Sequence, residues 1–96
     1  MYAVVRQYSS AQDLTQPVEE NRESLKTTMK SVPGLVAYYL ITDGTSVTTV
    51  TICNDQAGAE ASIQKAAEWV KQTLSPDIGL SAPQITQGDV VIDITK

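Results

Sequence analysis

A small set of side chains could bind or act on a small molecule. An indole can stack on a planar ligand, phenols and amides can form hydrogen bonds with it, and a guanidinium can bind a carboxylate through two parallel hydrogen bonds. These residue types suit an aromatic ligand, but they form no set of nucleophile, base and orienting group, so catalytic residues stay unassigned. The ligand-binding candidates are Arg6, Tyr38, Tyr39, Asn54, Ser62 and Trp69.

Trp69 has two interpretations that depend on its place on a helix. Apolar residues recur at three- and four-residue steps through this segment, and Trp69 lies well off the centre of their stripe. The indole is therefore expected at the rim of the core. There it would either pack over the sheet edge or a partner subunit, or form the wall of a ligand pocket. Ser62, on the same helix face, could contribute a hydroxyl. The stripe consists of Ala59, Ile63, Ala66, Val70 and Leu74.

Arg6 alternates with apolar residues in a strand-like segment, on the same face as Val4 and Tyr8. If that face is interior, the guanidinium needs a partner such as Asp89, Asp93 or a ligand carboxylate. If the face is at the surface or an edge, an ion pair there is the simpler expectation. Asp89 and Asp93 alone give only a weak signal for acid–base chemistry or for a hard cation.

The tyrosines and Asn54 also have structural alternatives. Tyr8, Tyr38 and Tyr39 could offer hydroxyls to a ligand, but tyrosines of this kind are more often core residues with one solvated end. Asn54 or Asp55 stands where the second helix should begin, and either side chain could cap it.

Several chemistries are excluded by composition. The 96 residues contain no histidine, which removes imidazole bases, Ser-His-Asp triads and most zinc sites. The single cysteine, Cys53, permits no internal disulfide, and its place in an apolar-alternating run favours a half-buried small hydrophobe over a reactive thiol. No phosphate-binding loop, dinucleotide fingerprint or metal-ligand spacing occurs, so no metal is expected.

The elements that must position these residues follow from periodicity. Alternating apolar residues predict strands over 2–8, 35–42 and 47–53, the last two joined by an Asp-Gly hairpin turn. Helical spacing predicts helices over 15–32 and 55–74, and Pro33-Gly34 ends the first. Residues 75–79 form a loop rich in helix breakers. A last strand is predicted over 84–95, interrupted at Gly88-Asp89.

This β-α-β-β-α-β order predicts one α+β domain of 96 residues with a ferredoxin-like fold. A four-stranded antiparallel sheet would carry both helices on one face, with right-handed crossovers giving the spatial order 4-1-3-2. The strand over 35–42 is apolar on both faces: Val36, Tyr38 and Leu40 on one, and Leu35, Ala37, Tyr39 and Ile41 on the other. A second copy packed sheet against sheet would cover the open face, so we expect a homodimer.

Charge and leader sequences bear on partners and location. The net charge is −4, and the seven basic residues are scattered. Nucleic acids and anionic membranes are therefore not expected partners. The chain begins with a strand-like stretch rather than a basic-then-apolar leader, and no stretch is long and apolar enough to span a membrane, so we expect a cytoplasmic protein.

Four segments resemble small bacterial proteins of the antibiotic biosynthesis monooxygenase (ABM)-like group, in the dimeric α/β-barrel superfamily. They are Tyr-Ala-Val-Val-Arg-Gln-Tyr at 2–8, Val-Pro-Gly-Leu-Val-Ala-Tyr-Tyr at 32–39, Asp-Gln-Ala-Gly-Ala-Glu-Ala-Ser at 55–62 and Ala-Ala-Glu-Trp-Val at 66–70. The resemblance implies a ferredoxin-like protomer, a dimer joined through the sheets and, in catalytic branches, a pocket between helices and sheet.

The resemblance also implies candidate activities. Cofactor-free oxygenases of the group oxidise phenolic or quinol substrates with asparagine, tryptophan and tyrosine side chains, whereas haem-degrading relatives need a histidine that this chain lacks. Two functions stay open: a cofactor-free monooxygenase acting on an aromatic or quinol-like molecule, and a non-catalytic small-molecule-binding or interaction module. A pocket filled by side chains would instead leave a purely structural dimer.

Overall fold

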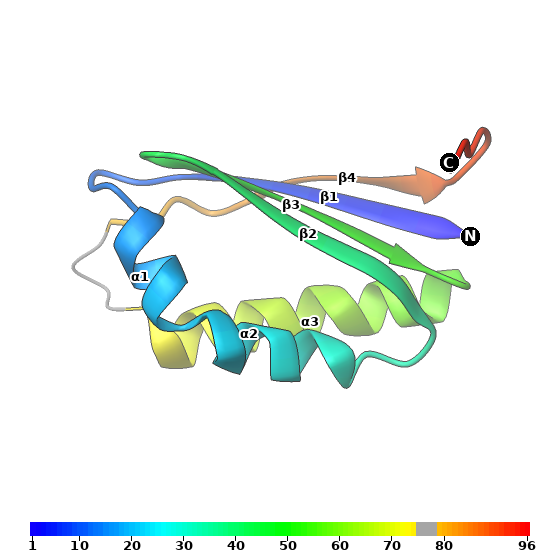
Figure 1. Cartoon of the computed structure of the whole chain (residues 1–96), viewed down its shortest axis with the longest axis horizontal. Coiled ribbons are helices and arrows are strands. Elements are labelled where there is room, and N and C mark those ends of the chain that lie inside the picture. Colours follow the sequence, from blue (N-terminus) through cyan, green and yellow to red (C-terminus); the bar gives the residue numbers. More distant parts are fainter. Residues whose placement is uncertain (75–78) are drawn as a thin grey trace.

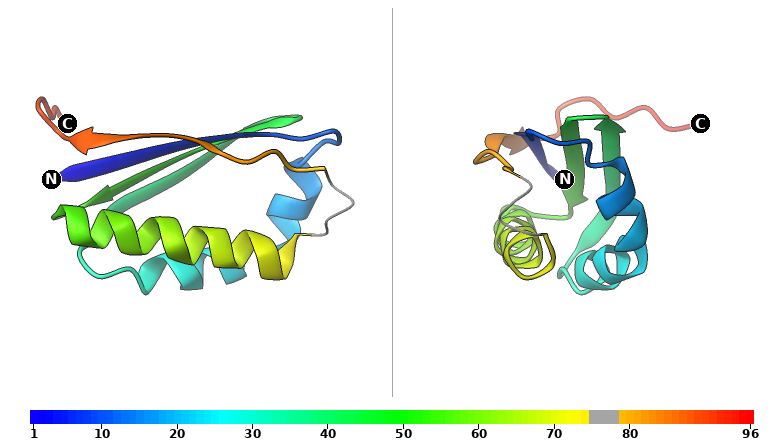
Figure 2. Two further views of the ribbon diagram at one scale, coloured as in Figure 1. Left: turned by 180° about the vertical axis from the view of Figure 1, so that it is seen from behind. Right: turned by 90° about the vertical axis from the view of Figure 1, so that its left-hand side faces the viewer.

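The computed structural model describes residues 1–74 and 79–96 and contains one four-stranded antiparallel sheet with the order β2-β3-β1-β4. Helices lie on one face of this sheet, as two views show (Figures 1 and 2). The ferredoxin-like fold and strand order predicted from the sequence are confirmed. Of the loop predicted over 75–79, residues 75–78 lie outside the described residues. The elements are β1 (Tyr2–Ser9), α1 (Thr15–Glu20), α2 (Arg22–Lys30), β2 (Leu35–Asp43), β3 (Ser46–Cys53), α3 (Gln56–Thr73) and β4 (Gln84–Asp89).

The helix predicted over 15–32 is divided into α1 and α2 at Asn21. The backbone of Asn21 leaves the helical region, with φ −109° and ψ 16°. Its side-chain amide donates a hydrogen bond to the carbonyl of Pro17 at 2.8 Å. An asparagine that bonds to nearby backbone in this way offers the chain an alternative to a continuous helix, so α1 and α2 can meet the sheet at different angles.

An irregularity in β2 determines which residues of that strand face the helices. Leu35 pairs with Cys53 and Ala37 with Ile52, so Val36 is an extra residue in the ladder. Beyond it Tyr38 and Leu40 lie on the helix side, whereas Tyr39 and Ile41 are 59% and 55% exposed on the opposite side. The bulge also leaves Leu35 packed against the core and Val36 51% exposed. The predicted faces of this strand are therefore wrong at Leu35 and at Val36.

The last strand is shorter than predicted. β4 pairs with β1 from Gln84 to Asp89, and Val90 donates one further backbone hydrogen bond to the carbonyl of Met1 at 2.9 Å. Beyond that point no described strand is available to pair with the tail, so the strand predicted to reach Thr95 ends at Asp89. The tail leaves Val91, Ile92 and Ile94 between 80% and 88% exposed.

The main core cluster lies between the sheet and helices α2 and α3 and comprises Leu25, Met29, Val32, Cys53, Ala66 and Trp69. Gly58, in the first turn of α3, permits close packing against the turn before β2. A Cβ atom at this position would lie 2.5 Å from the carbonyl oxygen of Pro33. Cys53 is fully buried, where desolvation raises the pKa of its thiol, as expected for a small core residue.

Candidate functional site

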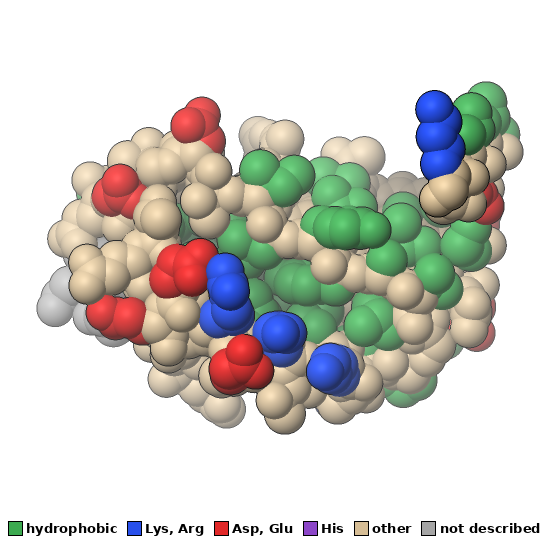
Figure 3. Space-filling model, viewed as in Figure 1, with side chains coloured by type: hydrophobic (Ala, Val, Ile, Leu, Met, Phe, Trp, Pro, Cys, Tyr) green, Lys and Arg blue, Asp and Glu red, His purple; other side chains and the backbone are tan. Residues whose placement is uncertain are grey.

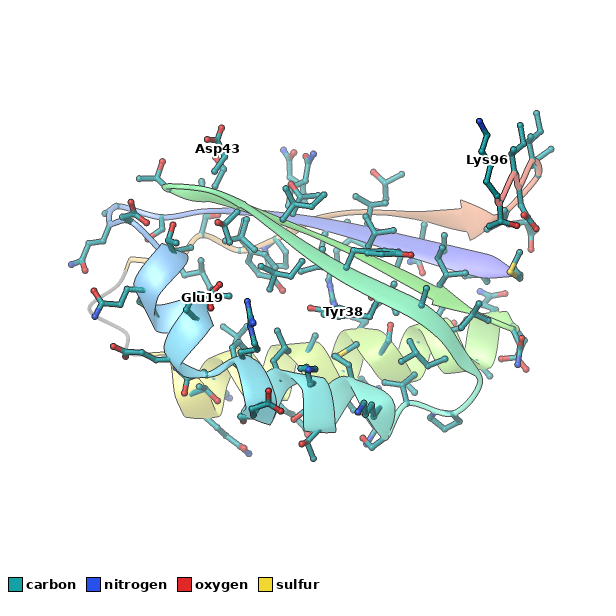
Figure 4. The ribbon with its side chains drawn as sticks, in the orientation of Figure 1. Glu19, Tyr38, Asp43 and Lys96 are labelled. Atoms are coloured by element: carbon teal, nitrogen blue, oxygen red, sulfur yellow. The ribbon has the colours of Figure 1, made fainter. Side chains whose placement is uncertain are left out.

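A cavity of about 30 Å³ lies between the helix side of the sheet and the helices. This volume accommodates about two water molecules. Most of the wall is aliphatic, and Figure 4 shows that Tyr38 points from β2 into the layer between sheet and helices. The polar or aromatic side chains in the wall are Arg6, Tyr8, Tyr38, Thr49 and Trp69. The sequence candidates Arg6, Tyr38 and Trp69 are thus brought together.

Arg6 lies in the middle of the sheet and is only 1% exposed. Its Nε donates a hydrogen bond to Thr49 Oγ1 at 3.2 Å, and its Nη1 donates to the carbonyl of Ser62 at 3.2 Å. Nη2 is buried and has no hydrogen-bond partner among the residues that the structure describes. The predicted surface or edge ion pair is therefore wrong.

Neither carboxylate considered from the sequence compensates this charge. Asp89 pairs with Tyr2 at the far end of β1, Asp93 lies in the tail beyond β4, and both are exposed. Every other carboxylate among the described residues is exposed as well.

Tyr38 stands beside Arg6 on the neighbouring part of the sheet. Burial raises the pKa of the Tyr38 phenol to about 12, although the Arg6 guanidinium acts in the opposite direction. Desolvation outweighs the attraction of the cation here, so the phenol keeps its proton at neutral pH. Tyr38 can therefore donate a hydrogen bond to a ligand oxygen.

Trp69 is 7% exposed and belongs to the core, so its predicted place at the rim is wrong. Its Nε1 donates a hydrogen bond to Ser24 Oγ of α2 at 3.0 Å. Helix α3 contacts both the sheet and α2. Because α2 covers a further part of the surface of α3, residues outside the apolar stripe, such as Trp69, are also buried. The indole lines the cavity as a wall, and its N–H is already used.

Ser62 is fully buried, but its hydroxyl is turned back onto its own helix, where it donates to the carbonyl of Ala59 at 2.6 Å. What Ser62 offers the site is its backbone carbonyl, which accepts from Arg6. The hydroxyl contribution considered from the sequence is thus not seen.

Two candidates lie away from the cavity. Tyr39 is on the opposite face of the sheet from Tyr38. Asn54 is exposed at the start of α3, where its backbone N–H donates to the carbonyl of Gly34 at 2.9 Å. The cap is Asp55, whose Oδ1 accepts from the N–H of Gly58 at 2.9 Å.

Thr49 was missed by sequence reasoning. It lies opposite Arg6 in the β1–β3 ladder and supplies the hydroxyl that accepts from Nε. The available signal was the register between β1 and β3: once these strands are paired, the residue beside a buried arginine becomes a candidate partner.

A groove of about 400 Å³ lies outside the cavity, between α1, α2 and the edge strand β2. The groove and the cavity share Val18, Leu25, Tyr38 and Leu40 in their walls. In the space-filling view, hydrophobic side chains gather between β2 and α2, and basic side chains follow the helix rim (Figure 3).

The basic side chains of the groove rim are partly balanced by acids. Arg22 pairs with Glu19 at 3.0 Å, and Lys26 pairs with Glu23 at 3.7 Å. These pairs are largely exposed, so their interaction is screened by solvent.

Within residues 1–74 and 79–96, no three side chains of the metal-binding types His, Cys, Asp and Glu cluster together. In the same part of the chain, no helix has the length and apolar character needed to cross a membrane.

No protein-family model and no curated protein sequence matches the chain. Solved structures do match it over nearly its whole length. A protein of unknown function from Nitrosomonas europaea has a TM-score of 0.75 at 15% identity, covering 99% of this chain and 93% of that one. The monooxygenase ActVA-Orf6 of Streptomyces coelicolor, in complex with nanaomycin D, has a TM-score of 0.71 at 17% identity, and the match covers 99% of this chain and 91% of that one. SnoaB, a cofactor-independent oxygenase from Streptomyces nogalater, has a TM-score of 0.66 at 12% identity, and the match covers 99% of this chain and 97% of that one.

Further matching structures, from Deinococcus radiodurans and Chloroflexus aurantiacus, carry an assignment to the antibiotic biosynthesis monooxygenases. These structures agree with this chain over nearly the whole length of both. The chain has the ferredoxin-like fold of the ABM-like proteins, as its sequence resemblance predicted.

Proposed function

We propose that this chain binds a small aromatic or quinol-like molecule between its sheet and helices and oxidises it with dioxygen without a cofactor. The observation that carries the proposal is the apolar cavity in which Arg6, Tyr38 and Trp69 meet beside an open groove. Its support from similarity is that oxygenases share this fold.

The chemistry asked of the protein is modest. In cofactor-free oxygenation the substrate itself supplies the four electrons that reduce dioxygen; one oxygen atom stays on the substrate and the other leaves as water. The protein then has to exclude water, orient the substrate and stabilise negative charge that develops on it. The buried guanidinium of Arg6 and the protonated phenol of Tyr38 are suited to that last task.

The sizes of the two spaces determine how a ligand would be placed. The inner cavity of about 30 Å³ takes a single polar group, whereas the groove of about 400 Å³ takes a ring system. We place the ring against Tyr38 and Leu40, with its oxygen directed toward Arg6. Tyr38 and Leu40 line both the cavity and the groove. Small changes in the rotamers of these two side chains would therefore admit the ligand from the groove to the cavity.

Oxygen consumption with anthrone and 1,4-naphthoquinol tests the enzymatic proposal. We expect enzyme-dependent uptake that Trp69→Phe, which trims the cavity wall, lowers at least several-fold. Gln72→Ala, an exposed change on α3, is the matched control and should leave the rate unchanged. No uptake above the uncatalysed rate with either compound would remove the enzymatic proposal.

One observation favours a non-catalytic alternative. The described part of the cavity wall contains no carboxylate, imidazole or thiol, so none of the described residues that line the space is a conventional general base. A binding module with the same pocket is therefore the second candidate. Tight binding of these compounds, measured anaerobically by calorimetry, without product formation in air would favour the module over the enzyme.

We further propose that the functional unit is a homodimer joined through the outer sheet face. That face carries Val50, Ile52, Ala37, Tyr39 and Ile41, and no described helix covers it (Figure 1). An apolar surface of this kind on a short chain is best covered by the same surface of a second copy around a two-fold axis. The exposed apolar residues of the C-terminal tail would gain cover from the same association.

Light scattering coupled to size-exclusion chromatography tests the dimer. We expect twice the chain mass at micromolar concentration, and we expect Tyr39→Glu to shift the protein toward monomer. Gln64→Glu, which adds the same charge to the exposed side of α3, should leave the mass unchanged. A wild-type monomer at micromolar concentration would contradict the proposal.

A further inference from the structure

The guanidinium of Arg6 is a buried cation that has no counter-charge within residues 1–74 and 79–96. It is 1% exposed, and its hydrogen bonds go to one hydroxyl and one backbone carbonyl, both neutral. The ion pairs found among the described residues involve Arg22 and Lys26 at the surface. Arginine stays charged in proteins, so it cannot relieve its burial by losing a proton.

The unpaired atom belongs to a residue of the cavity wall. Arg6 is among the lining residues, its Nε and Nη1 are used by Thr49 and Ser62, and its buried Nη2 has no partner among the described residues. Thr49 and Ser62 fix the plane of the guanidinium from two sides. A donor held in this way, with one N–H pair unused, is prepared for an acceptor that comes from outside the chain.

A second donor stands beside it. Tyr38 lines both the cavity and the groove, and its phenol lies close enough to Arg6 for the two to interact. A cation and a neutral hydroxyl donor in an otherwise aliphatic space favour an oxygen that carries negative charge. A neutral amide or ester would leave the cation uncompensated.

From this juxtaposition we infer that the ligand binds as an anion, with a carboxylate or ring-oxyanion oxygen on Arg6 Nη2 and the Tyr38 hydroxyl and its aromatic body in the groove. This inference rests on the proposed function for the site, and it narrows the ligand to aromatic acids and ionised phenols or enols. The rim cations Arg22 and Lys26 add a weak attraction at the groove but are already paired with acids.

Binding of 2-naphthoate and of its neutral counterpart 2-naphthamide, measured by calorimetry at neutral pH, tests the inference. The wild-type protein should bind the anion at least about tenfold more tightly than the amide. Arg6→Met should weaken 2-naphthoate by about tenfold to a hundredfold and leave 2-naphthamide nearly unchanged. Arg6→Lys, which keeps the positive charge but not the planar set of donors of the guanidinium, should retain part of the preference for 2-naphthoate over 2-naphthamide.

Arg22→Met separates the buried cation from the rim, because Arg6 and Arg22 are the arginines of the chain. Equal affinity for anion and amide, or a larger loss of 2-naphthoate with Arg22→Met than with Arg6→Met, would overturn the inference. Oxygen uptake is read separately. If the protein binds 2-naphthoate through Arg6 but shows no turnover, the oxygenase proposal is wrong and the anion-binding inference stands. If turnover occurs and is unchanged in Arg6→Met, the oxygenase proposal stands and the anion-binding inference is wrong.

Discussion

Replacing Arg6 by methionine should stabilise the ligand-free protein, although it removes a fully buried side chain with two hydrogen bonds. The two bonds have a charged donor but are long, at 3.2 Å, so we assign them about 1.5 kcal/mol each, the lower end for bonds of a charged group. Against this stands the effective cost of burying an uncompensated ion, several kcal/mol. Methionine fills similar volume with a flexible apolar chain.

The difference favours the variant by about 1 kcal/mol or more. For a domain of this size, 1 kcal/mol corresponds to roughly 4–8 °C in the unfolding midpoint. Thermal unfolding by circular dichroism, with both proteins at the same concentration because a dimer's midpoint depends on it, gives the comparison. Arg22→Met, which removes an exposed arginine, is the control and should change stability by less than about 0.5 kcal/mol.

Ligand should reverse this order. At 2-naphthoate concentrations about a hundredfold above its dissociation constant, the wild type gains roughly 2.7 kcal/mol, and the methionine variant gains little. An Arg6→Met protein no more stable than the wild type without ligand would refute the reasoning, because the guanidinium would then be compensated within the chain.

Three other changes follow from the same structure. Gly58→Ala should destabilise by about 1–3 kcal/mol in urea denaturation, since its Cβ would meet the Pro33 carbonyl at 2.5 Å, whereas Gly88→Ala, with nothing within 4 Å, should cost far less; equal costs would contradict the packing at Gly58. Tyr38 has a pKa raised to about 12 from 10.0, so the unfolded chain loses this proton first and stability should fall as pH rises between those values. Tyr38→Phe should lessen that fall, and an unchanged slope in parallel denaturation curves would count against burial of the phenol. Asp55→Ala should cost about 1 kcal/mol through loss of the α3 cap, whereas Asp43→Ala should have little effect; the urea midpoint decides.

The fold was predictable because its signals are local. Alternation, helical spacing, the Pro33-Gly34 stop and the Asp43-Gly44 turn each act within a few residues, and Gly34 and Gly44 do take positive φ values of 73° and 64°. The errors arose where a neighbouring strand determines the local structure. The bulge at Val36 and the end of β4 depend on how the strands pair, and the alternation of apolar residues within one strand does not reveal that pairing.

The site was harder to predict, for the same reason. That Arg6 faces the helices depends on which face of β1 is covered, and its partners Thr49 and Ser62 are distant in the sequence. Trp69 is buried because α2 packs beside α3, so the buried arc is set by two neighbours rather than by one stripe. Asn54 and Asp55 are equally good caps by type, and only the backbone geometry selects Asp55.

A crystal structure of the protein grown with 2-naphthoate tests the central claim most directly. We predict density for the ring along Tyr38 and Leu40, with a carboxylate oxygen within hydrogen-bond distance of Arg6 Nη2 and of the Tyr38 hydroxyl. A carboxylate bound instead at Arg22 or Lys26 on the rim, or an unoccupied cavity under saturating ligand, would contradict it.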